Sequence, residues 1–218
     1  MSGDMMNDMN NELAAALAHE IKNPISVIRA NVDYIKLSVK PQYSKCFGII
    51  DRELDKLTSL ITDYTAILQP DTKKEMIFIE DLIYDITEEF SILNTKEITF
   101  SFDLDSEAAI QGDYKKLSIL LFNIYKNSIE AIKSKGEILT KLYRKDNDTI
   151  IEITDTGSGI SSDIAGKIGT PFLTTKENGS GLGLMICRTI ARAHNGTVTL
   201  ENIDGGCKTT IKFKNQEE

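Results

Sequence analysis

The chain has 218 residues, of which 41% are hydrophobic and 27% charged, a balance typical of a globular protein with one large or two modest domains. Its net charge of −8 argues against nucleic acid as the main partner, because duplex binding needs a basic surface. No apolar run reaches the ~20 residues of a membrane helix, and the N-terminus lacks a signal-peptide pattern. The cysteines are scattered and suggest neither a disulfide framework nor a zinc site. We therefore expect a cytoplasmic protein without a membrane partner.

The first 70 residues or so have the apolar spacing of two helices. Apolar residues recur every three or four positions in two runs: Leu13, Leu17, Ile21, Ile25, Ile28, Val32, Ile35 and Val39, then Phe47, Ile50, Leu54, Leu57, Ile61, Tyr64 and Leu68. Pro41 separates the runs and is tolerated only in a first helical turn, so it marks the start of the second helix. A short connection makes the helices antiparallel, and two such hairpins would form a four-helix bundle, so we expect a homodimer. On periodicity alone, a dimerisation arm without chemistry is the favoured alternative.

A histidine lies one turn before a proline in the first helical run. His19 stands in the stretch Leu-Ala-His-Glu-Ile-Lys-Asn-Pro of residues 17–24, and Pro24 would bend the helix there. Most histidines on helices are structural, but a pure scaffold needs no bend at this point. We therefore take His19 as a candidate functional residue.

A short polar linker follows Pro70, and beyond it the pattern becomes mixed, which predicts domains of residues 1–70 and 71–218. Strands are predicted at 77–79, 98–104, 137–143, 149–154, 197–201 and 208–214, and helices at 81–93, 114–133 and 181–194. Strands with helices to one side indicate a two-layer α+β sandwich.

Two asparagines lie on one face of the long predicted helix. Asn123 and Asn127 are one turn apart, and amide oxygens suit Mg²⁺, a hard ion that keeps phosphate oxygens among its ligands. Taken alone, two surface asparagines are the more common explanation of this pair.

An aspartate with two glycines follows a predicted strand. The carboxylate of Asp155 only accepts hydrogen bonds, so it could accept one from the exocyclic amine of adenine. Gly157 and Gly159 would let the backbone turn beside the base. The motif alone could be an ordinary tight turn.

A glycine-rich stretch precedes the predicted helix of residues 181–194. Gly179, Gly181 and Gly183 free the backbone, and a helix N-terminus presents amides to phosphate. The preceding Thr- and Lys-containing stretch would be a mobile lid from which Lys176 could reach a phosphate. A dinucleotide-binding fingerprint does not fit, since that motif opens the first unit of a parallel sheet, and a Walker loop does not fit because no Gly-Lys-Ser/Thr ends it.

These motifs, in this order, resemble those of sensor histidine kinases of two-component and phosphorelay signalling, from Leu13 to Lys214. The resembling segments are residues 19–24 (phosphoacceptor box), 123–131 (N box), 155–159 (first glycine box), 171–176 (F box) and 179–184 (second glycine box). The stretch Thr-Thr-Lys-Glu is closest to nitrogen-regulation and sporulation kinases. The chain lacks room for a sensor domain, so it would be a catalytic core, either regulated by partners or part of a longer protein.

The resemblance implies a Bergerat-type (GHKL) ATP-binding fold that uses ATP and Mg²⁺. Related hydrolases carry a catalytic glutamate where this chain has Asn123, which suits transfer to His19 rather than to water. Glu20 would be the base or orienting carboxylate, a response regulator aspartate would receive the phosphoryl group, and Asn23 would support a phosphatase activity. The nucleotide-binding residues implied are Asn123, Asn127, Asp155, Gly157, Gly159, Phe172, Thr174, Thr175, Lys176, Gly179, Gly181, Leu182 and Gly183, with Asn123 and Asn127 on the metal.

Two further alternatives are a phosphotransfer scaffold that no longer uses ATP and a serine kinase acting on an anti-anti-sigma partner. The scaffold should lose glycines or asparagines of the ATP motifs, and all are present. The serine kinase would need neither the helical hairpin nor its histidine.

Overall fold

The computed structural model describes residues 21–38, 43–68, 74–93, 96–161 and 181–214, which belong to two compact units. One unit contains the two helices of a hairpin, and the other contains the described strands with three helices. None of the helices in these ranges is both long and apolar enough to span a membrane. The domain boundary near residue 70 stays a prediction, because it falls outside the described residues.

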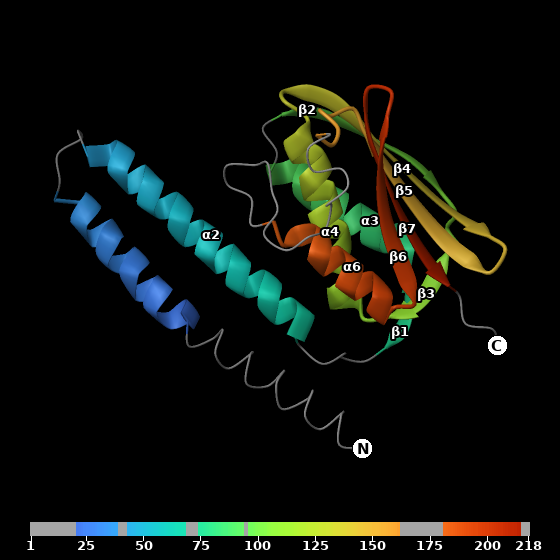
Figure 1. The fold of residues 1–218 in the computed structure, drawn as a ribbon, viewed down its shortest axis with the longest axis horizontal. Coiled ribbons are helices and arrows are strands. Elements are labelled where there is room, and N and C mark those ends of the chain that lie inside the picture. Colours follow the sequence, from blue (N-terminus) through green and yellow to red (C-terminus); the bar gives the residue numbers. More distant parts are fainter. Residues whose placement is uncertain (1–20, 39–42, 69–73, 94–95, 162–180, 215–218) are drawn as a thin grey trace, which may run out of the picture. The chain divides into compact units, whose positions relative to one another are not determined.

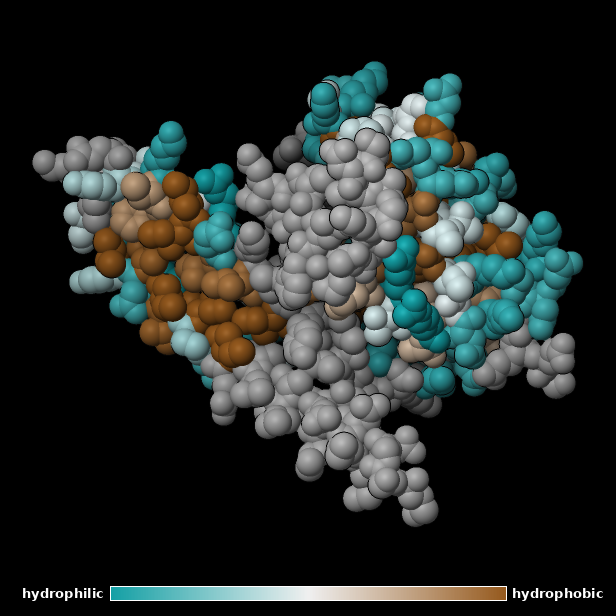
Figure 2. All heavy atoms as spheres, viewed as in Figure 1, coloured by the Kyte–Doolittle hydropathy of each residue, from teal (hydrophilic) through white to brown (hydrophobic). Residues whose placement is uncertain are grey.

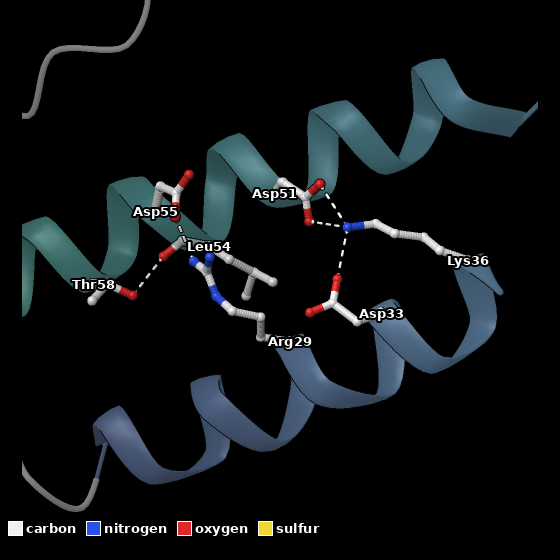
Figure 3. A network of polar contacts seen from close by, with 7 residues as sticks. All are labelled: Arg29, Asp33, Lys36, Asp51, Leu54, Asp55 and Thr58. Carbon is white, nitrogen blue, oxygen red and sulfur yellow. Dashed lines mark hydrogen bonds and ion pairs between the residues drawn. The ribbon is translucent and has the colours of Figure 1, made fainter. Parts of the chain in front are cut away.

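The first unit is an antiparallel helical hairpin. Residues 21–36 form its first helix, which includes Pro24, and α2 (Ser44–Leu68) forms the second. The ion pairs between the two helices show that the helices run antiparallel, because Lys36 contacts Asp51 near the connection and Arg29 contacts Asp55 further away (Figure 3). The predicted hairpin is confirmed, and Pro41 lies outside the described residues.

Few of the apolar side chains that the structure describes in the hairpin are buried within one chain. Ile25, Val32 and Leu54 are buried. Phe47 and Ile61 are half-buried. The remaining large apolar side chains that the structure describes in the hairpin are exposed and form much of the hydrophobic surface of this unit in Figure 2: Ile21, Val27, Ile28, Tyr34, Ile35, Leu37, Tyr43, Ile49, Ile50 and Leu57. The hairpin therefore has more apolar surface than its own two helices can cover.

The second unit is built on a five-stranded sheet of order β2-β4-β5-β7-β6, with a separate two-stranded sheet. Strand β2 runs parallel to β4, and the other neighbours are antiparallel. The strands of the large sheet are β2 (Glu97–Leu104), β4 (Lys135–Lys145), β5 (Asp148–Asp155), β6 (Gly196–Ile203) and β7 (Gly206–Lys214), and the small sheet pairs β1 (Glu75–Phe78) with β3 (Ala109–Gly112).

Three helices cover one face of the large sheet (Figure 1): α3 (Ile79–Leu93), α4 (Tyr114–Ala131) and α6 (Gly183–Ala193). Alternate residues of β5 and β7, such as Ile151, Ile153 and Ile211, are buried beneath them, as expected when one side of a sheet faces a core. Leu120 and Ile186 are buried on the helices. The predicted two-layer α+β sandwich is confirmed.

The structure corrects several predicted element boundaries. Helix α6 begins at Gly183 rather than at residue 181, because Gly181 has φ +69, a left-handed conformation that cannot belong to a helix. Helix α4 ends at Ala131, where Ile132 becomes extended. The sequence pattern missed β3, whose four residues are too few to show a period.

Candidate functional site

The helix that carries Asn123 and Asn127 is capped at both ends. At the N-terminus, the side chain of Asp113 accepts a hydrogen bond from the backbone of Lys116 at 3.1 Å. At the C-terminus, Lys96 Nζ donates to the carbonyl oxygens of Ile129 and Ile132 at 2.7 and 2.5 Å. Caps satisfy backbone groups that a helix leaves unpaired, so α4 is a defined platform for the two asparagines.

Asn123 and Asn127 are both half-buried on α4. Asn123 Nδ2 donates to the carbonyl of Ile119 at 2.9 Å, which directs Oδ1 toward the first residue of α6. A Cβ on Gly183 would lie only 2.8 Å from that oxygen. The absence of a side chain at Gly183 therefore lets the N-terminus of α6 approach the Asn123 amide.

Asp155 ends β5, and its carboxylate is buried. Its Oδ1 accepts a hydrogen bond from the backbone of Gly157 at 2.9 Å, which closes a tight turn. A Cβ on Gly157 would lie 2.6 Å from the Cβ of Ala131, so this glycine allows the turn to pack on the end of α4. Burial, and secondarily the charge of Asp155, raises the pKa of the nearby Cys207 thiol to about 11.

The loop that follows Asp155 is anchored to β4 and to α4. Thr156 N donates to the carbonyl of Glu137 at 3.1 Å, and Thr156 Oγ1 accepts from Glu137 N at 2.9 Å. Ser158 N donates to the carbonyl of Ala131 at 3.1 Å. These bonds hold the loop against the C-terminal end of the asparagine helix.

The result is an elongated site along α4. From Ala131, next to the Asp155 loop, to Asn123, next to Gly183, the helix axis advances about 12 Å, with Asn127 between them. One end offers a buried carboxylate, which accepts hydrogen bonds. The other offers amide oxygens and the N-terminus of α6, whose dipole favours anions. Such a site suits a ligand with a hydrogen-bonding base at one end and phosphates at the other.

Several of the predicted site residues lie outside the described residues: His19, Glu20, Phe172, Thr174, Thr175, Lys176 and Gly179. Asn23 is exposed on the first helix of the hairpin, and Leu182 is buried just before α6. The structure brings Asn123 and Gly183 together, and it places Asp155, Gly157 and Gly159 on one loop. The roles of all these residues stay predictions.

No group of three or more His, Cys, Asp or Glu side chains within the described ranges could hold a metal ion. The candidate metal donors are amide oxygens instead. Because Asn123 Nδ2 is engaged with Ile119, its Oδ1 is the atom directed away from its own helix. An oxygen donor of this kind fits a hard cation such as Mg²⁺.

Two family models match the two units of the chain. The model described as His Kinase A (phospho-acceptor) domain matches residues 9–71. The model described as Histidine kinase-, DNA gyrase B-, and HSP90-like ATPase matches residues 112–217. The chain belongs to the histidine kinase family. The resemblance to histidine kinases that the sequence motifs indicated is thereby confirmed.

This histidine kinase is 32% identical to sporulation kinase B of Bacillus subtilis (strain 168) over 214 residues, which are 93% of the chain and 49% of that protein. It is also 32% identical to sporulation kinase E of the same organism over 201 residues, or 89% of the chain and 27% of that protein. The chain thus spans half or less of the length of these relatives.

Three solved structures share the fold, and two of them are of the histidine kinase ThkA. The catalytic domain of ThkA has 26% sequence identity and a TM-score of 0.61, covering 66% of this chain and 96% of that one. ThkA in complex with the response regulator protein TrrA has 26% identity and a TM-score of 0.67, covering 94% of this chain and 61% of that one. Full-length ShkA in complex with AMPPNP has a TM-score of 0.73 at 22% identity, over 95% of this chain and 47% of that one.

One residue that holds the site of this histidine kinase was missed by the sequence analysis. His194 directly follows the last residue of α6. Its side chain is buried, and Nε2 accepts a hydrogen bond from Asp113 N at 3.0 Å, while Nδ1 donates to the carbonyl of Ile190 at 2.8 Å. No local pattern could reveal this contact, because its partners are 81 residues apart.

Proposed function

We propose that this chain is the catalytic core of an autophosphorylating protein histidine kinase, which transfers the γ-phosphoryl group of ATP to His19 and then to an aspartate of a response regulator. The observation that carries the proposal is the arrangement along α4, with Asn123 and Asn127 between the Asp155 loop and the start of α6. The ATPase family model that covers these elements supports it.

ATP would bind with adenine at the Asp155 end. The carboxylate of Asp155 would accept a hydrogen bond from the exocyclic amine, and the turn at Gly157 would lie beside the base. The glycines before α6 and the N-terminus of that helix would hold the phosphates. Lys176, Phe172, Thr174, Thr175 and the backbone around Gly179 complete this proposed nucleotide site.

Mg²⁺ would be held by the amide oxygens of Asn123 and Asn127 together with phosphate oxygens, and when bound it would neutralise charge on the transferred group. The Nδ2 bond of Asn123 to Ile119 supports this role, because it leaves the oxygen to face the site. Asn123 also stands where related hydrolases carry a base that activates water. Because Asn123 has no carboxylate that could activate water, the site favours transfer of the phosphoryl group to an incoming nucleophile.

His19 would be that nucleophile. The Nε2 lone pair of a neutral imidazole attacks the γ-phosphorus, the bond to the β-phosphate oxygen breaks, and ADP leaves. Glu20 would accept the Nδ1 proton or orient the ring, and Asn23 would position water in a phosphatase reaction on the regulator. The phosphoacceptor family model, which covers residues 9–71, supports the role of this segment.

The proposed partners are a second copy of the chain and a response regulator. The exposed apolar side chains of the hairpin, such as Val27, Ile35 and Leu57, support a four-helix-bundle homodimer that would cover them. ThkA, which shares the fold, has been solved with a response regulator protein. With ATP as the donor, we expect the reaction in the cytoplasm.

Incubation of the full chain with γ-labelled ATP and Mg²⁺ tests the proposal. We expect label that is lost in acid and retained in base, as a phosphoramidate requires, and that is absent in the variant His19→Gln. Asn127→Ala removes the proposed oxygen ligand and should fold and lose labelling. Base-labile, acid-stable label, or label that persists in His19→Gln, would reject the acceptor, and normal labelling of Asn127→Ala would reject the metal role.

A further inference from the structure

The side-chain amide of Asn202 holds both polar groups of one residue in the Asp155 loop. Asn202 lies on β6, at the edge of the sheet. Its Oδ1 accepts a hydrogen bond from Ile160 N at 2.7 Å, and its Nδ2 donates to Ile160 O at 2.8 Å. These are the two bonds that an opposing residue makes in an antiparallel ladder, so the amide acts as a short extra strand for Ile160.

Strand register explains why an edge residue reaches this loop. Asp155 pairs with Cys207 across β5 and β7, and Cys207 pairs with Asn202 across β7 and β6. The three residues therefore form one row across the sheet. Because the loop leaves β5 directly after Asp155, it passes over the end of β7 to the side chain of Asn202.

The loop backbone is shaped to accept this amide. Gly159 has φ +69, a left-handed conformation that favours glycine. A Cβ at Gly159 would also lie only 2.9 Å from Asn202 Oδ1. Glycine at this position thus serves both the turn and the close approach of Asn202.

We propose that Asn202 is a positioning residue for adenine recognition, which it performs by fixing the distal end of the Asp155–Ile160 loop. Thr156 and Ser158 fix the near part of this loop on β4 and α4. The Asn202 amide supplies the anchor at Ile160. This inference rests on the proposed nucleotide site, in which the Asp155 carboxylate and the Gly157 turn contact the base.

The chemistry of the amide makes the role specific. Only a side chain with both an acceptor and a donor can bind the N–H and the C=O of one residue. Aspartate at position 202 would keep the bond to Ile160 N and repel Ile160 O. The variant Asn202→Asp therefore separates the paired contact from the space that the side chain fills.

The experiment measures binding of ADP and IDP, each with Mg²⁺, to the full chain by calorimetry. IDP carries a carbonyl where ADP carries the amine that would donate a hydrogen bond to Asp155. The ratio of the two affinities therefore reports adenine recognition. The variants are Asn202→Ala and Asn202→Asp. The matched control is Asp204→Ala, because Asp204 is exposed two residues away and has no polar partner among the described residues.

We expect both Asn202 variants to bind ADP about five- to twenty-fold more weakly, as for the loss of one or two exposed hydrogen bonds, while IDP binding changes less. The control should bind both nucleotides as the wild type does. Unchanged ADP affinity, or an equal loss for ADP and IDP, would overturn the positioning role. A fall in urea stability with an unchanged ratio counts against it too.

The labelling assay with γ-labelled ATP separates this inference from the proposed kinase function. If the wild type labels His19 and the Asn202 variants keep the wild-type ratio of ADP to IDP affinity, only the inference fails. If the wild type binds neither nucleotide and takes no label, the proposed function fails and the inference fails with it.

Discussion

The imidazole of His194 accepts a buried hydrogen bond from the backbone N–H of Asp113, with an N to Nε2 distance of 3.0 Å. This bond ties the end of α6 to the start of α4, where Asp113 is the N-cap. The packing around it is tight, since a Cβ at Gly112 would lie 2.7 Å from His194 Cδ2. The helix that carries Asn123 and Asn127 therefore depends on a residue far from them in sequence.

Replacing His194 should destabilise the α/β unit. In His194→Leu the N–H of Asp113 would be buried without an acceptor, which costs about 1–3 kcal/mol of unfolding free energy. Urea unfolding followed by circular dichroism measures the loss. His194→Gln offers an amide oxygen in a similar place and should lose less. Equal losses in the two variants would mean that packing, rather than the hydrogen bond, holds this junction.

Lys96 should stabilise the opposite end of the same helix. Its amine donates to two C-terminal carbonyls of α4, and a cation there also opposes the helix dipole. Lys96→Met keeps the aliphatic chain and should lower the unfolding free energy by about 1 kcal/mol. Lys133→Met, at an exposed lysine without a polar partner among the described residues, is the control. A similar loss in both variants would count against a capping role.

The elements that the sequence predicted are those with a local signal. The apolar period of α4 and the alternation along β5 are each contained in a few neighbouring residues. The spacing of Asn123 and Asn127 likewise follows from one helix. The order of the motifs along the chain then indicated that the helical hairpin and the nucleotide site belong to one kind of protein.

The contacts that the sequence did not predict join segments far apart in the chain. His194 reaches Asp113, Lys96 reaches Ile129, and Asn202 reaches Ile160, and each depends on how the sheet and helices pack. A single sequence contains no periodic signal for such pairs. The helix ends were displaced for a local reason, since a left-handed glycine or an extended cap can stop a helix within an apolar run.

The three cysteines should differ in reactivity toward a thiol reagent such as dithionitrobenzoate. Cys46 is exposed, whereas Cys187 and Cys207 are buried. Burial, and secondarily the charge of Asp155, raises the pKa of Cys207 to about 11, so little thiolate forms near pH 8. One thiol should react quickly in the folded chain, and Cys46→Ser should remove that phase. A fast phase that survives would contradict the burial of the other two.

The same shift predicts how Cys207 affects stability at alkaline pH. Its pKa is higher in the folded chain than the usual value of about 8.5, so the folded state retains the proton longer. The contribution is fully present below the unfolded pKa and is lost as the pH rises through about 11. Cys207→Ala should lose less stability than the wild type between pH 8 and 11, as urea unfolding at each pH would show.

Among the glycines of the described residues, Gly206 should be the least tolerant of a side chain. It begins β7, and a Cβ there would overlap the carbonyl oxygen of Asp155 on the neighbouring strand. Gly206→Ala would force β5 and β7 apart beside the proposed adenine site, with an expected loss of more than about 3 kcal/mol of unfolding free energy.

Gly48→Ala is the opposite case, because nothing lies within 4 Å of the added Cβ on α2. It should raise stability by about 0.5–1 kcal/mol. Calorimetry of both variants tests the pair, and wild-type stability in Gly206→Ala would show that the β5–β7 register at Asp155 is wrong.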